Sequence, residues 1–228
     1  MFCFLFDLDG TLVLTGGAGI RAFDQAFREI FQTEGKIKSI SPAGKTDPAI
    51  LQMMCNRYLE RNPTEEEQRA VFSRYLEILK DEVEETDKFE VMPGIRPLLE
   101  YLHNHADCLL GLGTGNIKAG AEIKLRRPDL WKYFHFGGFG SDAPERSQLL
   151  QRALDRGTHL LKPGEKIHKV FVIGDTPNDI QAGHAIHAQT VGVATGPYPV
   201  KALEEAGADR VYKDLSAYQD FLGDVGVS

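Results

Sequence analysis

The sequence predicts a doubly wound α/β fold that is interrupted by one helical insertion. Two observations carry this prediction: short apolar runs alternate with helical patterns along most of the chain, and one long segment lacks any strand pattern. The apolar runs are Phe2–Phe6, Cys108–Leu112, Val170–Ile173 and Thr190–Ala194. Because they are continuously apolar and are bounded by Gly, Asp or Thr, they are typical of strands buried on both faces of a parallel sheet.

Three segments with helical periodicity lie between these apolar runs. The predicted helices are Ile95–Leu102 after Pro93-Gly94, Ser147–Leu154, and Asp179–Ala188 after Pro177. Proline and glycine are common at the first positions of helices and in the turns before them. Strands that alternate with helices in this way predict a parallel sheet covered on both faces.

The segment from Ala18 to Glu90 contains amphipathic helical patterns and no convincing strand. Its helices are expected at Arg21–Phe31, Pro48–Leu59 and Glu65–Val83. Glycine-rich or proline-containing turns flank it, at Thr15-Gly16-Gly17 and at Val91–Gly94. We therefore expect an α/β core formed by residues 1–15 and 91–228, with an all-helical cap formed by residues 16–90.

Composition and charge narrow the class of partner. The chain has 228 residues, with 33 acidic and 26 basic residues and a net charge of −7, which argues against a broad nucleic-acid interface. No apolar stretch is long enough to span a membrane, and Met1–Leu8 lacks the basic leader of a signal peptide. The three cysteines form no paired motif. We expect a cytoplasmic protein whose oligomeric state the sequence does not indicate.

Two carboxylates directly follow the first predicted strand. Asp7 and Asp9 are one residue apart in Phe6-Asp7-Leu8-Asp9-Gly10-Thr11. At the carboxyl edge of a buried strand this crowding of negative charge needs a compensating cation, and that edge is where open α/β sheets bind ligands. A solvent-exposed acidic turn would be the simpler interpretation if the motif stood alone.

A second acidic pair and a third polar strand end make a functional interpretation stronger. Asp175 and Asp179 follow Val170–Ile173 in Gly174-Asp175-Thr176-Pro177-Asn178-Asp179. With Asp7 and Asp9 they offer four carboxylates, a ligand set that suits Mg²⁺. The run Cys108–Leu112 ends in Gly113-Thr114-Gly115-Asn116, which brings a hydroxyl and a flexible glycine backbone to the same edge.

These three strand-end motifs, in this order, resemble those of the haloacid dehalogenase superfamily, and in particular its phosphoglycolate-phosphatase-like members. The resemblance covers nearly the whole chain and implies a Rossmann-like core with an inserted cap. It implies that Asp7 is a nucleophile phosphorylated during turnover, that Asp9 is the general acid/base, and that Thr114 binds the transferring phosphoryl group with Gly115 and Asn116 beside it. It also implies a magnesium site that Asp175 completes and Asp179 supports.

The family also has a basic residue, usually Lys, at the start of the helix that precedes its last motif. In this sequence the matching region is Gly140–Leu149, and Arg146 is the expected residue, which departs from the common Lys. The rival is Lys162, which is followed by Pro163 but lies late in the chain. In the predicted cap, Lys45 of Gly44-Lys45-Thr46-Asp47 lies in a segment similar to a cap loop that faces the active site, and substrate contact by Lys45 is left open.

The expected function is Mg²⁺-dependent hydrolysis of a small phosphorylated metabolite, a phosphomonoester, through an aspartyl-phosphate. A phosphomutase acting on a sugar phosphate would use the same core motifs and remains an alternative. A phosphonatase-like C–P hydrolase is disfavoured because Asp9 is retained, and a silent interaction protein is disfavoured because every chemical position is filled. Cap residues set the choice of substrate, and the sequence does not identify it.

Overall fold

The computed structural model describes residues 1–40 and 42–227, and in these residues the core is a six-stranded parallel sheet. The strand order is β5-β4-β1-β6-β7-β8. The strands are β1 (Phe2–Phe6), β4 (Cys108–Thr114), β5 (Phe136–Phe139), β6 (Lys169–Gly174), β7 (Gln189–Val193) and β8 (Arg210–Tyr212). Because the chain leaves β1 for β4 on one side and later places β6 on the other, β1 lies at the topological switch point where open sheets bind ligands.

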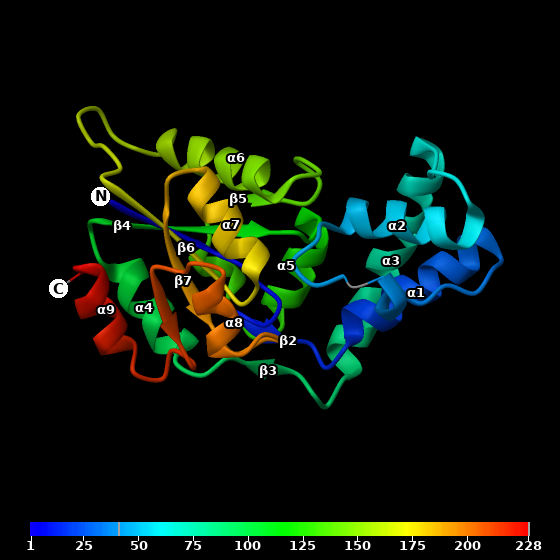
Figure 1. The fold of residues 1–228 in the computed structure, drawn as a ribbon, viewed down its shortest axis with the longest axis horizontal. Helices are drawn as coiled ribbons and strands as arrows, with labels where there is room; N and C mark the ends of the chain where they lie inside the picture. The colour runs from blue at the N-terminus through cyan, green and yellow to red at the C-terminus, as the bar shows by residue number, and fades with distance from the viewer. Residues whose placement is uncertain (41, 228) are drawn as a thin grey trace.

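Helices cover both faces of this sheet, as Figure 1 shows. One face packs against α4 (Ile95–Asn104), α5 (Lys118–Arg126) and α9 (Tyr218–Val225), and the other packs against α6 (Arg146–Thr158) and α7 (Pro177–Ala185). Side chains of β1 alternate between the two: Phe4 and Phe6 join the first apolar cluster, and Cys3 and Leu5 join the second. This alternation explains why the strand is apolar at every position.

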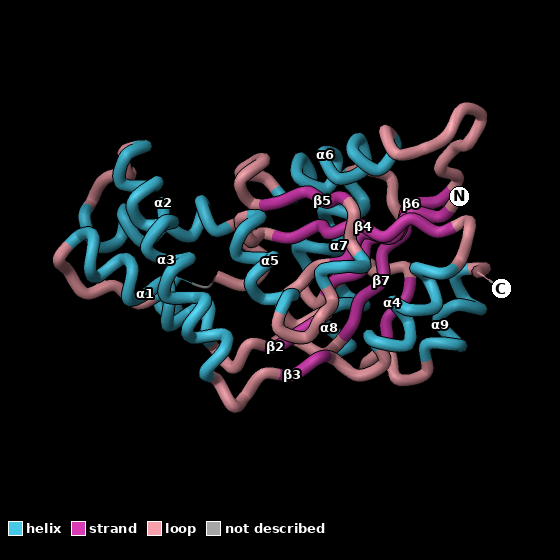
Figure 2. The backbone as a smooth tube through the Cα atoms, turned by 180° about the vertical axis from the view of Figure 1, so that it is seen from behind, coloured by secondary structure: helices cyan, strands magenta, loops and turns pink. Residues whose placement is uncertain are grey.

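The helices between β2 and β3 in the chain form a separate body beside the sheet, at the right of Figure 1 and the left of Figure 2. They are α1 (Ala18–Phe31), the 3₁₀ helix η1 (Ile37–Ile40), α2 (Asp47–Leu59) and α3 (Glu65–Glu85). Their apolar faces make a third cluster, to which Ile117 of the core also contributes. A capping box at Thr64 and Glu67 begins α3, and the Thr46 hydroxyl caps α2.

The two chain segments that join the core to the cap lie side by side. β2 (Val13–Leu14) pairs antiparallel with β3 (Glu90–Val91), the strand by which the chain returns to the core. Glu90 therefore belongs to a strand, although the sequence indicated only helices from Ala18 to Glu90. A two-residue strand carries too little periodicity to be recognised.

The predicted fold class, a doubly wound core with an inserted helical cap, is confirmed, and the four predicted strands are all present. The edge strands β5 and β8 were not predicted, and neither were the helices α5, α8 (Val200–Glu205) and α9. β5 contains Gly137 and Gly138, and β8 has only three residues, so both lack a clear strand pattern. The predicted helix Asp179–Ala188 is displaced, since α7 begins at Pro177 and ends at Ala185.

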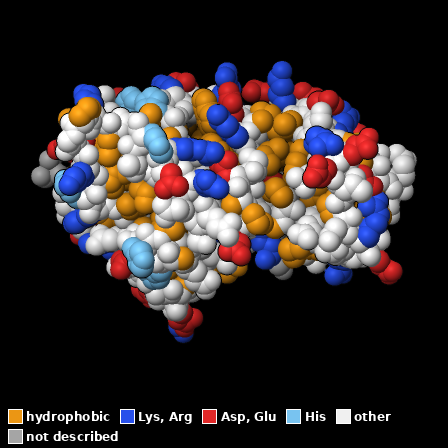
Figure 3. Space-filling model, turned by 90° about the horizontal axis from the view of Figure 1, so that it is seen from above, with side chains coloured by type: hydrophobic (Ala, Val, Ile, Leu, Met, Phe, Trp, Pro, Cys, Tyr) orange, Lys and Arg blue, Asp and Glu red, His pale blue; other side chains and the backbone are white. Residues whose placement is uncertain are grey.

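The surface mixes charges of both signs. On the face in Figure 3, basic and acidic side chains are interspersed with hydrophobic ones, and they form no continuous basic stripe there. Among the described residues, none of the helices is both long and apolar enough to cross a membrane.

Candidate active site

The three central strands end side by side, and Asp7 lies at their shared edge. Phe6 pairs with Leu112 of β4 on one side and with Ile173 of β6 on the other. The next residue, Asp7, donates its backbone N–H to the Ile173 carbonyl at 2.8 Å and is only 7% exposed. The register of β1 therefore fixes the Asp7 carboxylate between the ends of its two neighbours.

The turn after β1 requires a glycine. Gly10 has a positive φ of 83°, and a Cβ at this position would lie 2.4 Å from Oδ2 of Asp175. The hydroxyl of Thr11 lies 3.5 Å from Oδ1 of the same carboxylate. Any side chain at residue 10 would displace Asp175, so Gly10 allows the two acidic motifs to meet.

Asp179 is shared between the start of α7 and the site. Its Oδ2 accepts hydrogen bonds from the Thr176 backbone N–H at 3.1 Å and the Thr176 hydroxyl at 2.7 Å, which completes a capping box with Pro177 at the first helical position. Its Oδ1 lies 2.5 Å from Nη2 of Arg146. The cap geometry thus orients one oxygen of Asp179 toward the other acidic residues.

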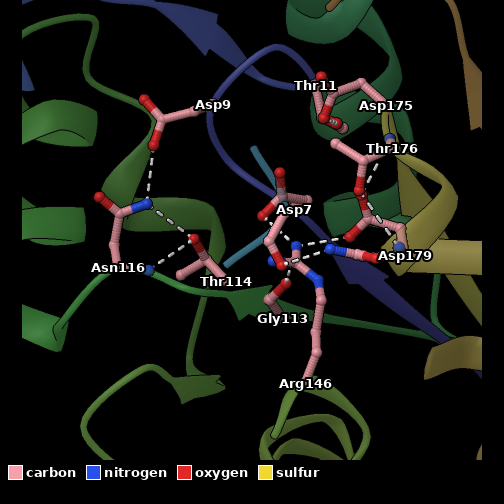
Figure 4. A network of polar contacts seen from close by, with 12 residues as sticks. Asp7, Asp9, Thr11, Gly113, Thr114, Asn116, Arg146, Asp175, Thr176 and Asp179 are labelled. Atoms are coloured by element: carbon pink, nitrogen blue, oxygen red, sulfur yellow. Dashed lines mark hydrogen bonds and ion pairs between the residues drawn. The ribbon is translucent and has the colours of Figure 1, made fainter. Parts of the chain in front are cut away.

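Three of the predicted carboxylates come together around one cation (Figure 4). Asp7, Asp175 and Asp179 each offer an oxygen within 4.8 Å of the others. Arg146, the first residue of α6, donates from Nη2 to Oδ1 of Asp7 at 2.6 Å and also contacts Asp179. Arg146, whose side chain is 8% exposed, therefore neutralises part of the charge at the centre of the cluster.

Burial and mutual repulsion dominate the electrostatics of this cluster. Burial raises the pKa of Asp7; the Arg146 guanidinium opposes that change, and the charges of Asp179 and Asp9 reinforce it. Burial also raises the pKa of Asp175, and Asp7 and Asp179 raise it further. One guanidinium does not balance three buried carboxylates, so the site favours a further cation or protons.

The oxygen atoms of the cluster fit a divalent metal ion. Oδ1 of Asp179 is buried and has only the ion pair with Nη2 of Arg146, whereas Nε of Arg146 is buried and has no hydrogen-bond partner. A carboxylate oxygen that shares one guanidinium with another carboxylate can still bind a hard cation such as Mg²⁺, and an unpartnered guanidinium N–H requires an acceptor such as a phosphate oxygen. The donor set suits Mg²⁺ because it consists of oxygen alone.

Asp9 lies apart from this cluster, on the opposite side of Asp7 from Asp179 in Figure 4. Its carboxylate accepts a hydrogen bond from Nδ2 of Asn116 at 2.8 Å and two from Nζ of Lys124, at 2.7 and 2.8 Å. Of the four carboxylates expected at the metal, Asp9 is thus the one that lies outside the buried cluster of Asp7, Asp175 and Asp179.

Lys124 was not among the residues predicted from the sequence. It lies on α5, is only 4% exposed, and also donates to Oδ1 of Asn116 at 2.7 Å. Its position on the buried face of the helix, with Ala121 and Leu125, was a usable signal, because a lysine within an apolar stripe needs a buried partner. No sequence pattern, however, links residue 124 to residue 9.

The predicted phosphate-binding residues follow β4. Thr114 is fully buried, and its hydroxyl accepts hydrogen bonds from the backbone N–H and Nδ2 of Asn116, at 3.2 and 2.9 Å. A Cβ on Gly115 would lie 2.2 Å from the carbonyl oxygen of Lys45, so a cap loop packs directly on this turn.

The start of α2 fastens the cap to the same turn. Asp47 donates its backbone N–H to the Gly115 carbonyl, and its Oδ2 accepts from the Ile117 backbone N–H, both at 2.8 Å. Asp47 is 8% exposed, and its burial raises its pKa to about 6. These two bonds place Lys45 at the active-site edge.

Lys162, the rival for the basic position, lies elsewhere. It is exposed in the loop between α6 and β6, where its backbone N–H donates to Glu165 at 2.8 Å. Arg146, by contrast, contacts Asp7 directly. The geometry therefore favours Arg146 over Lys162.

A cavity of about 670 Å³ lies over this edge, between the core and the cap. The predicted residues that line it are Asp7, Asp9, Lys45, Thr114, Gly115, Asn116, Arg146 and Asp175. Lys124 and Asp47 line it too. A single space thus joins the acidic cluster, the turn at residues 114–116 and the cap.

Comparison with known proteins identifies the family. The family model of haloacid dehalogenase-like hydrolases matches residues 4–193, and the chain belongs to this family. A Clostridium perfringens protein with the provisional name pyrophosphatase PpaX is 26% identical over 209 residues, which are 90% of this chain and 89% of that protein. The probable phosphatase IndB of Dickeya dadantii is 26% identical over 215 residues, with 89% and 85% covered.

Solved structures show the same fold. The crystal structure of a hydrolase from Pseudomonas syringae superposes with a TM-score of 0.72 at 23% identity and covers 99% of both chains. The predicted family and the predicted enzyme class, a phosphatase of this family, are confirmed by the family model and by these relatives.

Proposed function

We propose that this protein is a Mg²⁺-dependent phosphomonoester phosphatase that acts through an aspartyl-phosphate on Asp7. The observation that carries the proposal is the position of Asp7 between two different environments. On one side lie Asp175, Asp179 and Arg146, and on the other lies Asp9, held by Lys124 and Asn116. The nucleophile thus has a cation-binding side and an acid/base side.

The reaction takes two steps. An Asp7 oxygen attacks phosphorus, the bond from phosphorus to the ester oxygen breaks, and protonated Asp9 gives its proton to the departing alkoxide. Asp9 then takes a proton from water, which cleaves the aspartyl-phosphate and releases inorganic phosphate with Asp7 regenerated. General acid/base catalysis of this type contributes roughly 10²–10⁴-fold in rate.

The other residues bind charge. Asp7, Asp175 and Asp179 would hold Mg²⁺, which when bound neutralises the carboxylates and the phosphoryl oxygens. The Asp9 side chain, which was also expected at the metal, serves as the acid/base in this proposal. Arg146 neutralises Asp7 and the phosphoryl group.

The turn at residues 114–116 and the cap complete the site. We assign phosphate binding to Thr114, Gly115 and Asn116, with Lys45 of the cap loop beside them. We propose that residues 16–90 act as the cap domain on a core of residues 1–15 and 91–228. The cap closes over the phosphoryl group and removes bulk water while Asp7 attacks phosphorus, and the water that cleaves the aspartyl-phosphate enters after the alcohol has left.

The proposal is tested by measuring phosphate release from a panel of phosphomonoesters with Mg²⁺ and with EDTA. We expect turnover that depends on Mg²⁺ and is absent in Asp7→Asn. Acid quench during turnover, followed by mass spectrometry, should find phosphate on the peptide that contains Asp7. Turnover by Asp7→Asn, or isomerisation of glucose 1-phosphate without net phosphate release, would contradict the proposal.

A further inference from the structure

The cavity is much larger than a phosphoryl group requires, and its far wall is apolar. Beyond the catalytic residues, its volume of about 670 Å³ is bounded by side chains from β2, α1, η1, α2 and α3. This apolar wall consists of Leu14, Ile20, Phe23, Ile37, Ile50 and Tyr75. The leaving group of the substrate would occupy the space beside this wall, because the phosphoryl group must lie at Asp7.

The cations that line the cavity are already engaged or lie away from this wall. Arg146 contacts Asp7 and Asp179, and Lys124 binds Asp9. Lys45 belongs to the loop that packs on Gly115, at the phosphate end.

The last lining cation, Lys88, is exposed in the linker from the cap to the core, close to the acidic Glu90. The apolar wall therefore offers no buried cation among the described residues.

Acidic residues outnumber basic ones in the lining. Asp7, Asp9, Asp47, Asp175 and Glu90 face the cavity together with four lysine or arginine residues. The phosphoryl group itself would balance the charge of a bound Mg²⁺, so the metal ion would not neutralise a second anionic group on the substrate. A carboxylate or second phosphate on the leaving group would therefore be desolvated against a largely apolar wall without a cationic partner, which is strongly unfavourable.

We infer that the leaving group of the substrate is an uncharged, largely apolar alcohol, with an aromatic or branched aliphatic body that packs against Ile20, Phe23, Ile50 and Tyr75. This inference rests on the proposed phosphatase activity. It excludes phosphoglycolate and pyrophosphate as preferred substrates, because the first has a carboxylate in its leaving group and the second leaves as phosphate.

The inference is tested with esters that differ in the charge of the leaving group but hardly in its acidity. Phenyl phosphate, 2-naphthyl phosphate and 3-carboxyphenyl phosphate serve as the set, and phosphoglycolate and pyrophosphate are measured beside them. We expect kcat/KM for phenyl phosphate to exceed that for 3-carboxyphenyl phosphate by roughly tenfold or more, the scale of one unpaired buried charge or polar group. The naphthyl ester should be at least as good as the phenyl ester.

Two variants of α1 test whether the preference between these esters arises at the apolar wall. Ile20→Lys places a cation on the wall at a half-buried position, so it should narrow or reverse the preference for phenyl phosphate over its 3-carboxy derivative. Ile30→Lys is the matched control, because Ile30 is also a half-buried isoleucine of α1 but does not line the cavity. It should leave the preference unchanged.

The two proposals fail in distinguishable ways. Phosphate release that favours 3-carboxyphenyl phosphate, phosphoglycolate or pyrophosphate in the unmodified protein overturns the inference and leaves the phosphatase proposal intact. Equal effects of Ile20→Lys and Ile30→Lys on the preference also overturn it. No phosphate release from any compound overturns both.

Discussion

Lys124 binds both carboxylate oxygens of Asp9, with its Nζ 2.8 Å from Oδ1 and 2.7 Å from Oδ2. The lysine side chain is 5% exposed and the aspartate side chain 44% exposed, so a buried cation holds a carboxylate that faces the cavity. Asn116 supports both partners, since its amide donates to Asp9 and its carbonyl oxygen accepts from Lys124. Asp9, which we propose as the acid/base, is thus oriented from behind by a neighbour on α5.

Lys124→Met should lower kcat by roughly ten- to a hundredfold, because Asp9 loses its main anchor and small misplacement of a catalytic group has effects of that size. The loss in kcat/KM, which reports the first step, should be larger for alkyl phosphates than for p-nitrophenyl phosphate, since only poor leaving groups need the proton of Asp9 in that step. Lys118→Met, an exposed change on the same helix, is the control. Equal losses with both leaving groups would contradict a role through Asp9.

Asp7→Asn should abolish turnover without unfolding the protein. The amide is nearly isosteric but is not a competent nucleophile. Because the pKa of Asp7 is raised in the folded state, its charge lowers stability at pH values above that pKa. The melting temperature of Asp7→Asn in EDTA at pH 8 should therefore equal or exceed that of the unmodified protein. A large decrease would indicate that the contact with Arg146 outweighs the repulsion.

Arg146→Ala should lower kcat/KM by a factor on the order of a hundred or more, which is typical of losing one transition-state electrostatic contact. Arg146→Lys should recover part of the loss, because it restores the charge but not the planar geometry. Lys162→Ala should leave kcat/KM nearly unchanged because Lys162 is exposed in a distant loop. The basic role would be misassigned if Lys162→Ala lost activity and Arg146→Ala kept it.

Mg²⁺ should raise the melting temperature, and Asp179→Asn should weaken that effect. Oδ1 of Asp179, whose one partner is Arg146, is the oxygen that the substitution replaces or neutralises. The capping bond to Thr176 needs only an acceptor, so the fold should persist. Differential scanning fluorimetry across a Mg²⁺ titration measures the shift, and Asp87→Asn on the exposed surface is the control. An unchanged Mg²⁺ dependence would remove Asp179 from the metal site.

Asp47→Asn should stabilise the protein at neutral pH but not at acidic pH. Burial raises the pKa of Asp47 from 3.8 to about 6, so the folded state binds its proton more tightly than the unfolded state. The ionised Asp47 therefore lowers the free energy of unfolding. This loss grows as the pH rises from the ordinary pKa of 3.8 to about 6, and it is constant at higher pH. The loss is at most about 3 kcal/mol.

An asparagine at position 47 can still accept the Ile117 N–H through its carbonyl oxygen. Denaturant unfolding at two pH values, about 7.5 and about 4.5, checks the prediction by comparing the gain in unfolding free energy. The gain should shrink at the lower pH. A pH-independent gain would show that Asp47 is not ionised at neutral pH or that the substitution acts by another route.

The sequence alone determined the fold class and singled out several of the residues that line the candidate site. Continuous apolar strands and amphipathic helices are local patterns, so the core and the helical cap could be recognised without coordinates. The position of Asp7 was also accessible, because the residue after a central parallel strand must lie at the carboxyl edge of the sheet. Strands as short as β2 and β8 offered too few residues for their periodicity to be recognised.

Only the tertiary structure decided how the carboxylates divide. Four aspartates at two strand ends could form one cluster or two, and the chain spacing does not distinguish these arrangements. The split follows from partners far away in sequence: Arg146 from α6 joins Asp7 and Asp179, and Lys124 from α5 binds Asp9. Such pairings depend on how helices pack across the sheet edge, and a long side chain on a buried helical face does not reveal its partner until that packing is known.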